Sequence, residues 1–399
     1  MKLYIIAGEP SGDLHGSNLI KGIKSIDPDC QIRCWGGDLM QNAGGKLVKH
    51  YKESAVMGFW EVFKNLGKIS KNLSMCKKDI LDFSPDAVVL IDYPGFNFRI
   101  AKFAHNHKFK VFYYIAPKIW AWKESRGKRL KKYVDKLFII FPFEISYFKE
   151  RWNIDAIYNG NPLLDSVEQN PQTLQSREDF CKEEGLDCAN KFIALIPGSR
   201  RSEISYLLPT MIELVKQYPN HKFLITQAPS ITDSYYTEII TAELKKMEQK
   251  GVNIDELKNR FILLKDKTYA AMKHSDAAVV SSGTASLECA LIGTPQVVCY
   301  AASELSYIIA QQLVKGIKYI SLANLILDKQ IFIELLQHDY TVEKVSKELD
   351  KLLYDNSYRD NMIADYNSVK EILGGGGASN KVAKVMLDAV SENAVTESK

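Results

Sequence analysis

Short apolar runs alternate with longer amphipathic segments along most of this chain. In the N-terminal half, the runs that we predict to be strands are 3–7, 31–35, 87–91, 110–115 and 136–140. Several of them are rich in β-branched residues and do not alternate with polar ones, which is typical of strands buried on both faces. Helical segments such as 16–25 and 98–107 lie between them. This order predicts a doubly wound, parallel sheet.

The same pattern restarts after a polar stretch, 161–190, which we interpret as a linker with a short helix. The strands predicted in the second half are 192–196, 222–226, 260–264, 277–280 and 296–299. A glycine run at 374–377 ends one helix, and Ser379 or Asn380 is the candidate N-cap of the next. We therefore predict an α/β protein with two Rossmann-like parallel-sheet domains, 1–165 and 190–373, facing across a cleft. A C-terminal helix and tail, 374–399, would follow.

Two glycine-punctuated turns follow predicted strands, one in each half. The first, 8–16, carries Glu9, Ser11 and Asp13, but it has neither the dinucleotide G-x-G-x-x-G spacing nor the G-K-[ST] of a P-loop. The second is 282–285. Free N–H groups at a helix start attract phosphate, so two such turns favour an enzyme that joins two phosphate-bearing molecules. The alternative for the first turn is that Ser11 or Asp13 only caps the helix.

Charged residues after two other strands suggest chemistry. Asp92 closes the run 88–91, where a carboxylate acts either as a general base or as a helix cap. Arg200 follows the first strand of the second half, and a guanidinium fits phosphate by forked hydrogen bonds. Together with the turn 282–285 it predicts a diphosphate site. Glu288, one turn further on, would accept hydrogen bonds from ribose hydroxyls.

Two segments allow two interpretations each. Residues 59–66 place aromatic and aliphatic side chains on one helix face, flanked by Lys64, Lys68 and Lys71, which suits either a membrane-surface helix or a core helix. The basic run 126–132 is either a solvated helix face or a site for an acceptor phosphate.

Composition limits the function class. The 399 residues are 46% hydrophobic and 25% charged, as in an ordinary soluble protein, and the net charge of +4 is too small to indicate a nucleic-acid partner. No apolar segment is long enough to span a membrane, and residues 1–7 are too short a run for a signal peptide. The seven cysteines lack a C-x-x-C pair, so we expect reduced thiols in the cytoplasm and no bound metal.

Taken together, the motifs resemble one family, bacterial lipid-A-disaccharide synthase, nearly from end to end. The motifs that carry the resemblance are Gly8-Glu9-Pro10-Ser11-Gly12-Asp13, Val56-Met57-Gly58, Ile91-Asp92-Tyr93-Pro94, Trp120-Ala121-Trp122, Phe141-Pro142-Phe143-Glu144, Pro197-Gly198-Ser199-Arg200 and Ser282-Gly283-Thr284-Ala285. Two departures are visible. Asn161 stands where many relatives have His, and Gly95 stands where some have a second Asp.

The resemblance implies an inverting, metal-independent GT-B glycosyltransferase of lipid A biosynthesis without a cofactor. It would join UDP-2,3-diacylglucosamine to 2,3-diacylglucosamine 1-phosphate, releasing UDP, as a peripheral enzyme at the cytoplasmic surface of the inner membrane. By analogy Asp92 would be the base on the acceptor 6-hydroxyl, with Glu9 assisting. Arg200 and the helix start at 282–285 would stabilise the leaving UDP. Which of Glu9 and Asp92 takes the proton stays open, as does a homodimer.

The residues assigned to each part of the site are as follows. The UDP-sugar set is Gly198, Ser199, Arg200, Ser282, Gly283, Thr284, Ala285, Glu288 and Asn324. The acceptor set is Ser11, Asn97, Lys123 and Arg126. The membrane patch is Phe59, Trp60, Val62, Phe63 and Leu66.

Three other functions compete with this reading. Two are GT-B enzymes, a polyprenyl-linked N-acetylglucosamine transferase and a UDP-N-acetylglucosamine 2-epimerase. The third is a nucleotide-sugar binding protein without catalysis. An epimerase would not need an exposed apolar face at 59–66.

Overall fold

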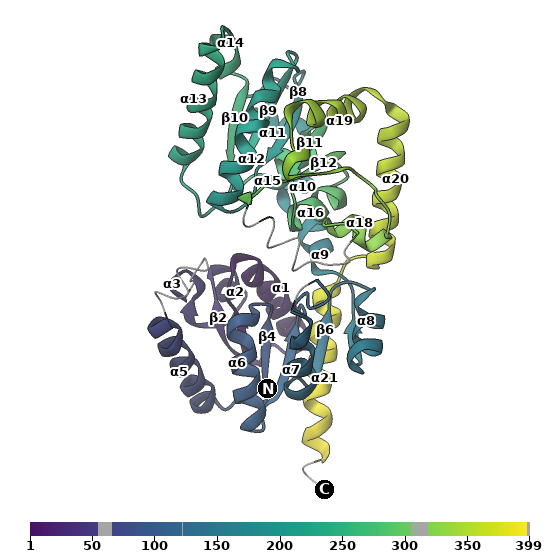
Figure 1. Cartoon of the computed structure of the whole chain (residues 1–399). Helices are drawn as coiled ribbons and strands as arrows, with labels where there is room; N and C mark the ends of the chain where they lie inside the picture. Colours follow the sequence, from purple (N-terminus) through teal and green to yellow (C-terminus); the bar gives the residue numbers. More distant parts are fainter. Residues whose placement is uncertain (55–65, 122, 305–306, 308–317, 397–399) are drawn as a thin grey trace. The chain divides into compact units, whose positions relative to one another are not determined.

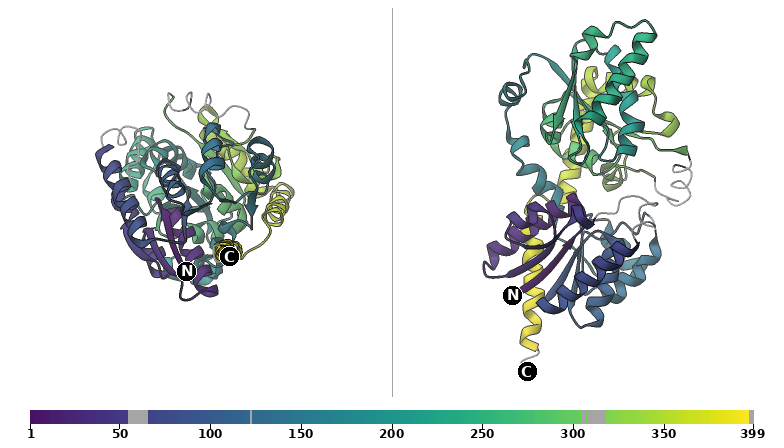
Figure 2. Two further views of the ribbon diagram at one scale, coloured as in Figure 1. Left: turned by 90° about the horizontal axis from the view of Figure 1, so that it is seen from below. Right: turned by 90° about the vertical axis from the view of Figure 1, so that its left-hand side faces the viewer.

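A computed structural model of the chain describes residues 1–54, 66–121, 123–304, 307 and 318–396. The chain forms two compact units (Figures 1 and 2). Unit 1 holds Met1–Asp165 together with Leu373–Lys399, and unit 2 holds Ser166–Ile372. The C-terminal segment therefore returns to the unit in which the chain begins.

The described strands of unit 1 form one parallel sheet in the order β3-β2-β1-β4-β5-β6-β7. The strands are β1 (Lys2–Ala7), β2 (Gln31–Gly36), β3 (Lys46–His50), β4 (Ala87–Ile91), β5 (Lys110–Tyr114), β6 (Lys136–Ile139) and β7 (Ala156–Tyr158). The helices are α1 (Pro10–Ile26), α2 (Asp38–Asn42), α3 (Tyr51–Ser54), α5 (Leu66–Phe83), α6 (Pro94–Asn106), η1 (Glu124–Arg126), α7 (Gly127–Tyr133), α8 (Glu144–Trp152), α9 (Pro162–Glu168), which runs on into unit 2, and α21 (Ala378–Thr396).

The core of unit 1 follows from the alternation of side chains along its strands. Tyr4, Val88 and Tyr113, on three neighbouring strands, pack in one cluster with residues of α5 and α6. Because side chains alternate across a strand, the intervening residues face the other side of the sheet, where α1 packs. Every residue of β4 is buried, as the unbroken apolar run predicted.

Strands β1 and β4 are neighbours although their paired residues, such as Leu3 and Ala87, lie far apart in sequence. Leu3 pairs with Ala87, and Ala7 pairs with Ile91, so the two strands end at the same level. From β1 the chain continues to β2 on one side, whereas β4 continues to β5 on the other. This reversal is a topological switch point, where the loops after the two strands diverge. Ligands of open α/β sheets bind at such points.

The C-terminal helix α21 packs against α1 (Figure 1). A Cβ atom at Gly22 would lie 2.8 Å from the Asn380 side chain, so glycine permits the close approach. The buried Asp165 carboxylate accepts hydrogen bonds from the backbone N–H groups of Gly377 and Ser379. The predicted N-caps were therefore wrong: Ser379 and Asn380 lie inside the helix, and a carboxylate more than 200 residues earlier caps its start.

The described strands of unit 2 form a second parallel sheet in the order β10-β9-β8-β11-β12-β13. The strands are β8 (Lys191–Ile196), β9 (His221–Gln227), β10 (Phe261–Lys265), β11 (Ala277–Ser281), β12 (Gln296–Tyr300) and β13 (Glu334–Leu336). The helices are α10 (Pro171–Leu174), α11 (Arg177–Glu184), α12 (Arg201–Glu213), η2 (Leu214–Lys216), α13 (Asp233–Gln249), α14 (Asp255–Lys258), α15 (Thr268–His274), α16 (Thr284–Ile292), α18 (Leu322–Leu327), η3 (Gln337–Asp339), α19 (Val342–Tyr354) and α20 (Asn356–Leu373), whose last residue is counted with unit 1. The switch point of this second sheet lies between β8 and β11, where Ile196 pairs with Val280.

The interior strands agree with the prediction to within one or two residues at each end. Three short strands were missed, namely β3, β7 and β13, and all three lie at the edges of their sheets. The predicted linker 161–190 contains three helices, α9, α10 and α11, instead of one. Among the described residues, no helix combines the length and apolar character required to cross a membrane.

Candidate active site

A strained turn places Asp92 at the carboxyl end of β4. Asp92 and Tyr93 have φ of +41° and +45°, a left-handed conformation that costs free energy in residues other than glycine. Hydrogen bonds hold the turn in place. The Asp92 N–H donates to the Tyr114 carbonyl at 3.1 Å, and the Asp92 carbonyl accepts from the Tyr113 hydroxyl at 2.7 Å. Strain of this kind persists where the surroundings fix it, and it is common at active sites.

Asn97 belongs to the same turn. Its amide Nδ2 donates to the Asp92 carbonyl at 2.8 Å and to the Ile91 carbonyl at 3.2 Å, and the side chain is 0% exposed. The side chain is buried in this structure, and a contact between Asn97 and the acceptor stays a prediction. The residue fixes the backbone that carries Asp92.

The loop after β1 lies against this turn. A Cβ atom at Gly8 would fall 2.4 Å from the Tyr93 ring, so only glycine lets the two segments meet. Glu9 is the N-cap residue of α1, but its side chain makes no capping hydrogen bond and is exposed, as is Ser11. The negative charge of Glu9 raises the pKa of Asp92. The two carboxylates predicted from separate strands therefore lie close enough to interact.

Asp13 has a structural role that sequence reasoning missed. Its buried carboxylate accepts hydrogen bonds from the N–H groups of Gly37, Leu39 and Met40, at 2.7, 3.2 and 3.1 Å. It therefore caps α2 rather than the helix in which it lies. Neither Ser11 nor Asp13 caps α1, and its N-cap residue Glu9 makes no capping hydrogen bond either.

The environment of Asp92 raises its pKa to about 6. The main cause is the protein packed around the carboxylate, although Asp92 itself is exposed to solvent. The charge of Glu9 raises the pKa further, whereas Lys118 and Arg126 lower it. A carboxylate in this range is ionised at neutral pH and still basic enough to accept a proton.

Two charged residues of unit 1 were not assigned a role from the sequence, and the charge of one of them, Lys118, acts on Asp92. Lys118 lies in the loop after β5, and Glu144 begins α8. Glu144 is 1% exposed and accepts hydrogen bonds from Trp120 Nε1 at 3.0 Å and from the N–H of Phe141 at 3.1 Å. The sequence signal for Glu144 was its place in the second of two aromatic motifs, 120–122 and 141–144. Its carboxylate links the two motifs by its hydrogen bonds to Trp120 and Phe141.

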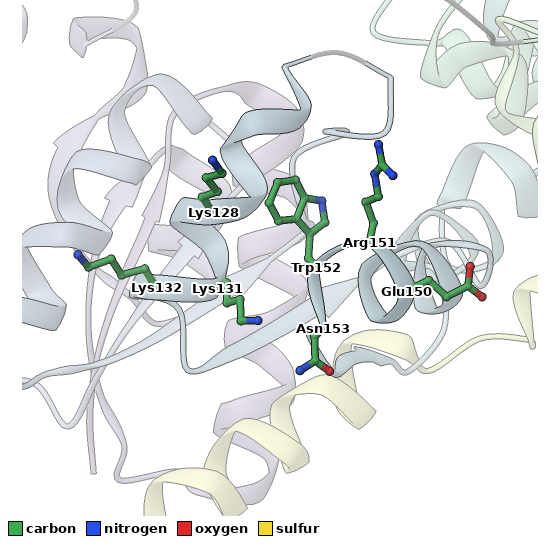
Figure 3. Close-up of a pocket in the computed structure, with 7 residues that line it drawn as sticks. All are labelled: Lys128, Lys131, Lys132, Glu150, Arg151, Trp152 and Asn153. Atoms are coloured by element: carbon green, nitrogen blue, oxygen red, sulfur yellow. The ribbon is translucent and has the colours of Figure 1, made fainter.

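The basic run after Trp120 divides into two parts. Arg126 is half-buried beside Phe98, 5.9 Å from the ring centre, and its charge acts on Asp92, whereas Lys123 is exposed. The later lysines of α7 instead line a separate pocket of about 490 Å³ with the end of α8 (Figure 3). The residues that line it are Lys128, Lys131, Lys132, Glu150, Arg151, Trp152 and Asn153. Arg126 of this run therefore lies near the Asp92 carboxylate, because its positive charge lowers the pKa of Asp92.

In unit 2, Glu203 shapes the turn that follows β8. Its carboxylate Oε2 accepts from the N–H groups of Ser199 at 2.9 Å and Arg200 at 3.3 Å, while Oε1 binds the Arg200 guanidinium at 3.2 Å. Gly198 has φ of +112°, and a Cβ atom there would lie 2.7 Å from the Glu203 Cβ. The turn therefore requires glycine, and it leaves the Arg200 side chain 66% exposed.

The next turn along the sheet follows β11 and starts α16. Gly283 is the N-cap residue with φ of +149° and has no side chain to cap the helix, and Gly283 and Thr284 are exposed. Glu288 is partly exposed and accepts a hydrogen bond from the Tyr269 hydroxyl at 2.7 Å. Burial raises the pKa of Glu288. Because β8 and β11 are adjacent, these two turns meet at one edge of the sheet.

Asn324, predicted to bind the UDP-sugar, is buried and forms hydrogen bonds within unit 2. It is 0% exposed, its Nδ2 donates to the Phe332 carbonyl and to Glu334 Oε1, and its Oδ1 accepts from the Ile331 N–H at 2.9 Å. These contacts use both its donors and its acceptor inside unit 2, and its role in binding the UDP-sugar stays a prediction. Asn161 is likewise buried, and its Nδ2 donates to the Ile140 carbonyl at 3.0 Å.

The side chains of the predicted membrane patch all lie outside the described residues. These are Phe59, Trp60, Val62 and Phe63, together with the side chain of Leu66. Trp122 of the aromatic motif also lies outside them.

The fold is shared with solved structures of nucleotide-sugar enzymes. It matches a UDP-GlcNAc 2-epimerase from Neisseria meningitidis bound to UDP-GlcNAc over 97% of this chain and 100% of the other, with a TM-score of 0.67 and 13% identity. A glycosyltransferase from Rickettsia africae matches with a TM-score of 0.56 and 12% identity, over 98% of both chains. At such identities the likeness shows the fold alone. The protein has two Rossmann-like units of the GT-B class, as predicted.

The sequence comparison is more specific. The lipid-A-disaccharide synthetase family profile matches residues 3–386. The lipid-A-disaccharide synthase of Geobacter metallireducens is 34% identical over 98% of both chains, and that of Coxiella burnetii (strain RSA 331) is 34% identical over 96% of this chain and 97% of its own. The chain belongs to the lipid-A-disaccharide synthase family, a family of hexosyltransferases. This confirms the resemblance and disfavours the epimerase reading, whose neighbours share only the fold.

Proposed function

We propose that the chain joins UDP-2,3-diacylglucosamine to 2,3-diacylglucosamine 1-phosphate, with Asp92 as the general base. Family membership supports the reaction, and the Asp92 turn supports the assignment of the base. One observation carries the assignment most strongly. A carboxylate with a pKa raised to about 6 is held by a strained turn at a switch point of the sheet, beside a second carboxylate.

The proposed reaction is a single displacement with inversion. As the acceptor 6-hydroxyl oxygen attacks the anomeric carbon of the donor sugar, its proton passes to the Asp92 carboxylate. The bond between the anomeric carbon and the UDP oxygen breaks, and its electron pair leaves with the diphosphate. Glu9 assists by raising the proton affinity of Asp92, because a nearby negative charge disfavours the ionised form. Ser11, Lys123 and Arg126 are proposed to bind the acceptor.

On the donor side, we assign charge stabilisation to Arg200 and to the start of α16. Negative charge develops on the diphosphate as the bond breaks, and a guanidinium and free backbone N–H groups stabilise it. The exposed N-terminus of α16 and the exposed Arg200 side chain support this role. Gly198, Ser199, Ser282, Thr284 and Ala285 complete the two turns. Glu288 is proposed to accept from the ribose hydroxyls.

We expect Asp92→Asn to lower the turnover rate by about 10²–10⁴-fold, because the general base is lost. UDP affinity should stay unchanged, since Asp92 lies in the other unit.

In the wild-type enzyme, kcat/KM should fall as the pH drops through about 6, where Asp92 becomes protonated. Transfer of a radiolabelled sugar measures the turnover rate and its pH dependence, and calorimetric titration with UDP measures the affinity of the Asp92→Asn variant. Asp82→Asn, an exposed carboxylate on α5, is the control. Near-normal turnover of Asp92→Asn would place the base elsewhere.

For the donor turn, we expect Glu203→Ala to weaken UDP binding by about tenfold. The substitution removes hydrogen bonds to the Ser199 and Arg200 backbone and frees the guanidinium, at about 1 kcal/mol for each bond. Isothermal titration with UDP measures the change. The control is Glu213→Ala, which breaks an ion pair with Lys216 at the other end of α12. Wild-type affinity in Glu203→Ala, with unchanged melting, would remove this turn from the UDP site.

We further propose that the protein works as a peripheral enzyme on the cytoplasmic surface of the inner membrane. Both proposed substrates carry acyl chains, which are costly to expose to water at about 0.8 kcal/mol per CH₂. The segment 59–71, with its aromatic residues and lysines, is the proposed contact.

Replacing Phe59, Trp60 and Phe63 with Ser should therefore reduce sedimentation with anionic phospholipid vesicles while the melting transition survives. A matched control replaces three exposed apolar side chains of unit 2, Leu174, Tyr206 and Tyr354, with Ser. Collapse of the melting transition in the first variant would show that the segment is core. Equal loss of binding in both variants would make the effect unspecific.

A further inference from the structure

The aromatic motifs at 120–122 and 141–144 have no part in the proposed mechanism, yet the structure brings their rings together. The rings of Trp120 and Phe143 meet edge-on with 5.2 Å between their centres, and the Phe143 ring stacks on that of Phe141 at 5.5 Å. Trp120 and Phe143 are partly exposed, whereas Phe141 is buried. We call Trp120 and Phe143 the aromatic wall, because their rings are the part of this cluster that reaches solvent.

A buried carboxylate holds the aromatic wall in place. Glu144 Oε1 accepts a hydrogen bond from Trp120 Nε1 at 3.0 Å, and Oε2 accepts from the N–H groups of Ile140 at 3.3 Å and Phe141 at 3.1 Å. These bonds satisfy the carboxylate inside the protein, where an unpaired one would be costly. The single polar atom of the Trp120 side chain is thereby used, so the indole offers only carbon surface to a ligand.

The loop that carries Trp120 starts with a strained residue, as the Asp92 turn does. Ile115 directly follows β5 and has φ of +61°, which a β-branched residue rarely adopts. The next N–H, that of Ala116, donates to the Phe138 carbonyl of β6 at 3.3 Å and ties the loop to the sheet. Strained residues therefore follow both β4 and β5, and strain of this kind gathers at ligand sites.

The aromatic wall lies at the same edge of the sheet as Asp92. Strands β4, β5 and β6 are parallel neighbours, and Asp92 follows β4, Trp120 follows β5 and Phe143 follows β6. The Asp92 N–H bonds to the Tyr114 carbonyl at the end of β5, which joins the first two of these turns directly. Because neighbouring strands are about 4.8 Å apart, the end of β6 lies about 10 Å from the end of β4. One hexose ring with its substituents spans that distance.

We propose that the aromatic wall binds the sugar ring of the acceptor while its 6-hydroxyl lies at Asp92. This inference rests on the proposed function, and it adds the surface that orients the acceptor. The C–H groups of a hexose face carry a small positive charge, and an aromatic face is negative, so the two attract each other. The exposed Lys118 and Lys123 flank Trp120 in the same loop. Such cations suit a phosphorylated sugar better than they suit an acyl chain.

The test is the KM for the acceptor in Trp120→Leu and Trp120→Phe, measured by sugar transfer. Both variants lose the N–H that binds Glu144, but only Trp120→Phe keeps an aromatic face. We expect the KM to rise about tenfold in Trp120→Leu and about threefold or less in Trp120→Phe, with kcat within about twofold of wild type in both. Phe103→Leu is the control, since this partly exposed ring of α6 contacts His107 at the far end of that helix and should keep the wild-type KM.

A second acceptor with shorter acyl chains separates the sugar ring from the lipid. If the wall binds the ring, the ratio of the KM of Trp120→Leu to that of the wild type should be the same for both acceptors. Phe143→Leu breaks no side-chain hydrogen bond and should also raise the KM, so it decides the question if the Trp120 variants do not fold. Melting curves show which variants are folded.

Three outcomes would overturn the inference. A wild-type KM in Trp120→Leu and Phe143→Leu shows that the wall does not touch the acceptor. A KM raised equally in Trp120→Leu and Trp120→Phe shows an effect of the lost hydrogen bond to Glu144, not of stacking. A KM ratio that shrinks with the shorter acyl chains makes the wall a lipid contact instead. Failure of the proposed function itself looks different, because the wild-type enzyme would then transfer no sugar to either acceptor.

Discussion

The order of strands in the two sheets is the constraint on which the candidate site depends. In each unit the first strand, β1 or β8, is bordered by a strand that arrives much later in the chain, β4 or β11. Parallel pairing brings the ends of both strands to one level, and the loops beyond them turn to opposite sides. Glu9 and Asp92 meet in this way in unit 1, and the turns at 198–200 and 282–285 meet in unit 2. Strand pairing alone is therefore enough to bring Glu9 close to Asp92 in unit 1, and the two turns close to each other in unit 2.

Within that arrangement, backbone strain and charge set the chemistry of Asp92. Its left-handed turn is stabilised by hydrogen bonds from Asn97 and Tyr113 to the backbone carbonyl of Asp92, and these fix the backbone that carries the carboxylate. Burial and the charge of Glu9 raise its pKa, while nearby cations lower it. The balance leaves a base that is ionised near neutral pH but still binds a proton. Unit 2 uses a carboxylate differently, since Glu203 shapes the turn that displays Arg200.

How much the sequence predicts depends on whether the signal is local. The interior strands were predicted because β4 and its neighbours are continuous apolar runs, whereas the edge strand β3 carries Lys46, Lys49 and His50 and lacks that signal. Asp92, Glu9 and Arg200 were found because each lies in the turn that follows a buried strand. Asn97 and Asn324 look like ligands in the sequence, and only the tertiary structure shows that both amides bind the backbone inside their units. Asp13 and Asp165 act on segments remote in sequence, so no local pattern could reveal their roles.

The central claim is that Asp92 is the base and that Glu9 adjusts it from a neighbouring strand end. The most direct measurement is the pH profile of kcat/KM in Glu9→Gln, which removes one negative charge with little change in size. The account predicts that the acidic limb moves to lower pH, because the pKa of Asp92 falls when the like charge is removed, and that turnover persists at neutral pH. Loss of turnover at every pH in Glu9→Gln, with an active Asp92→Asn, would contradict it and make Glu9 the base.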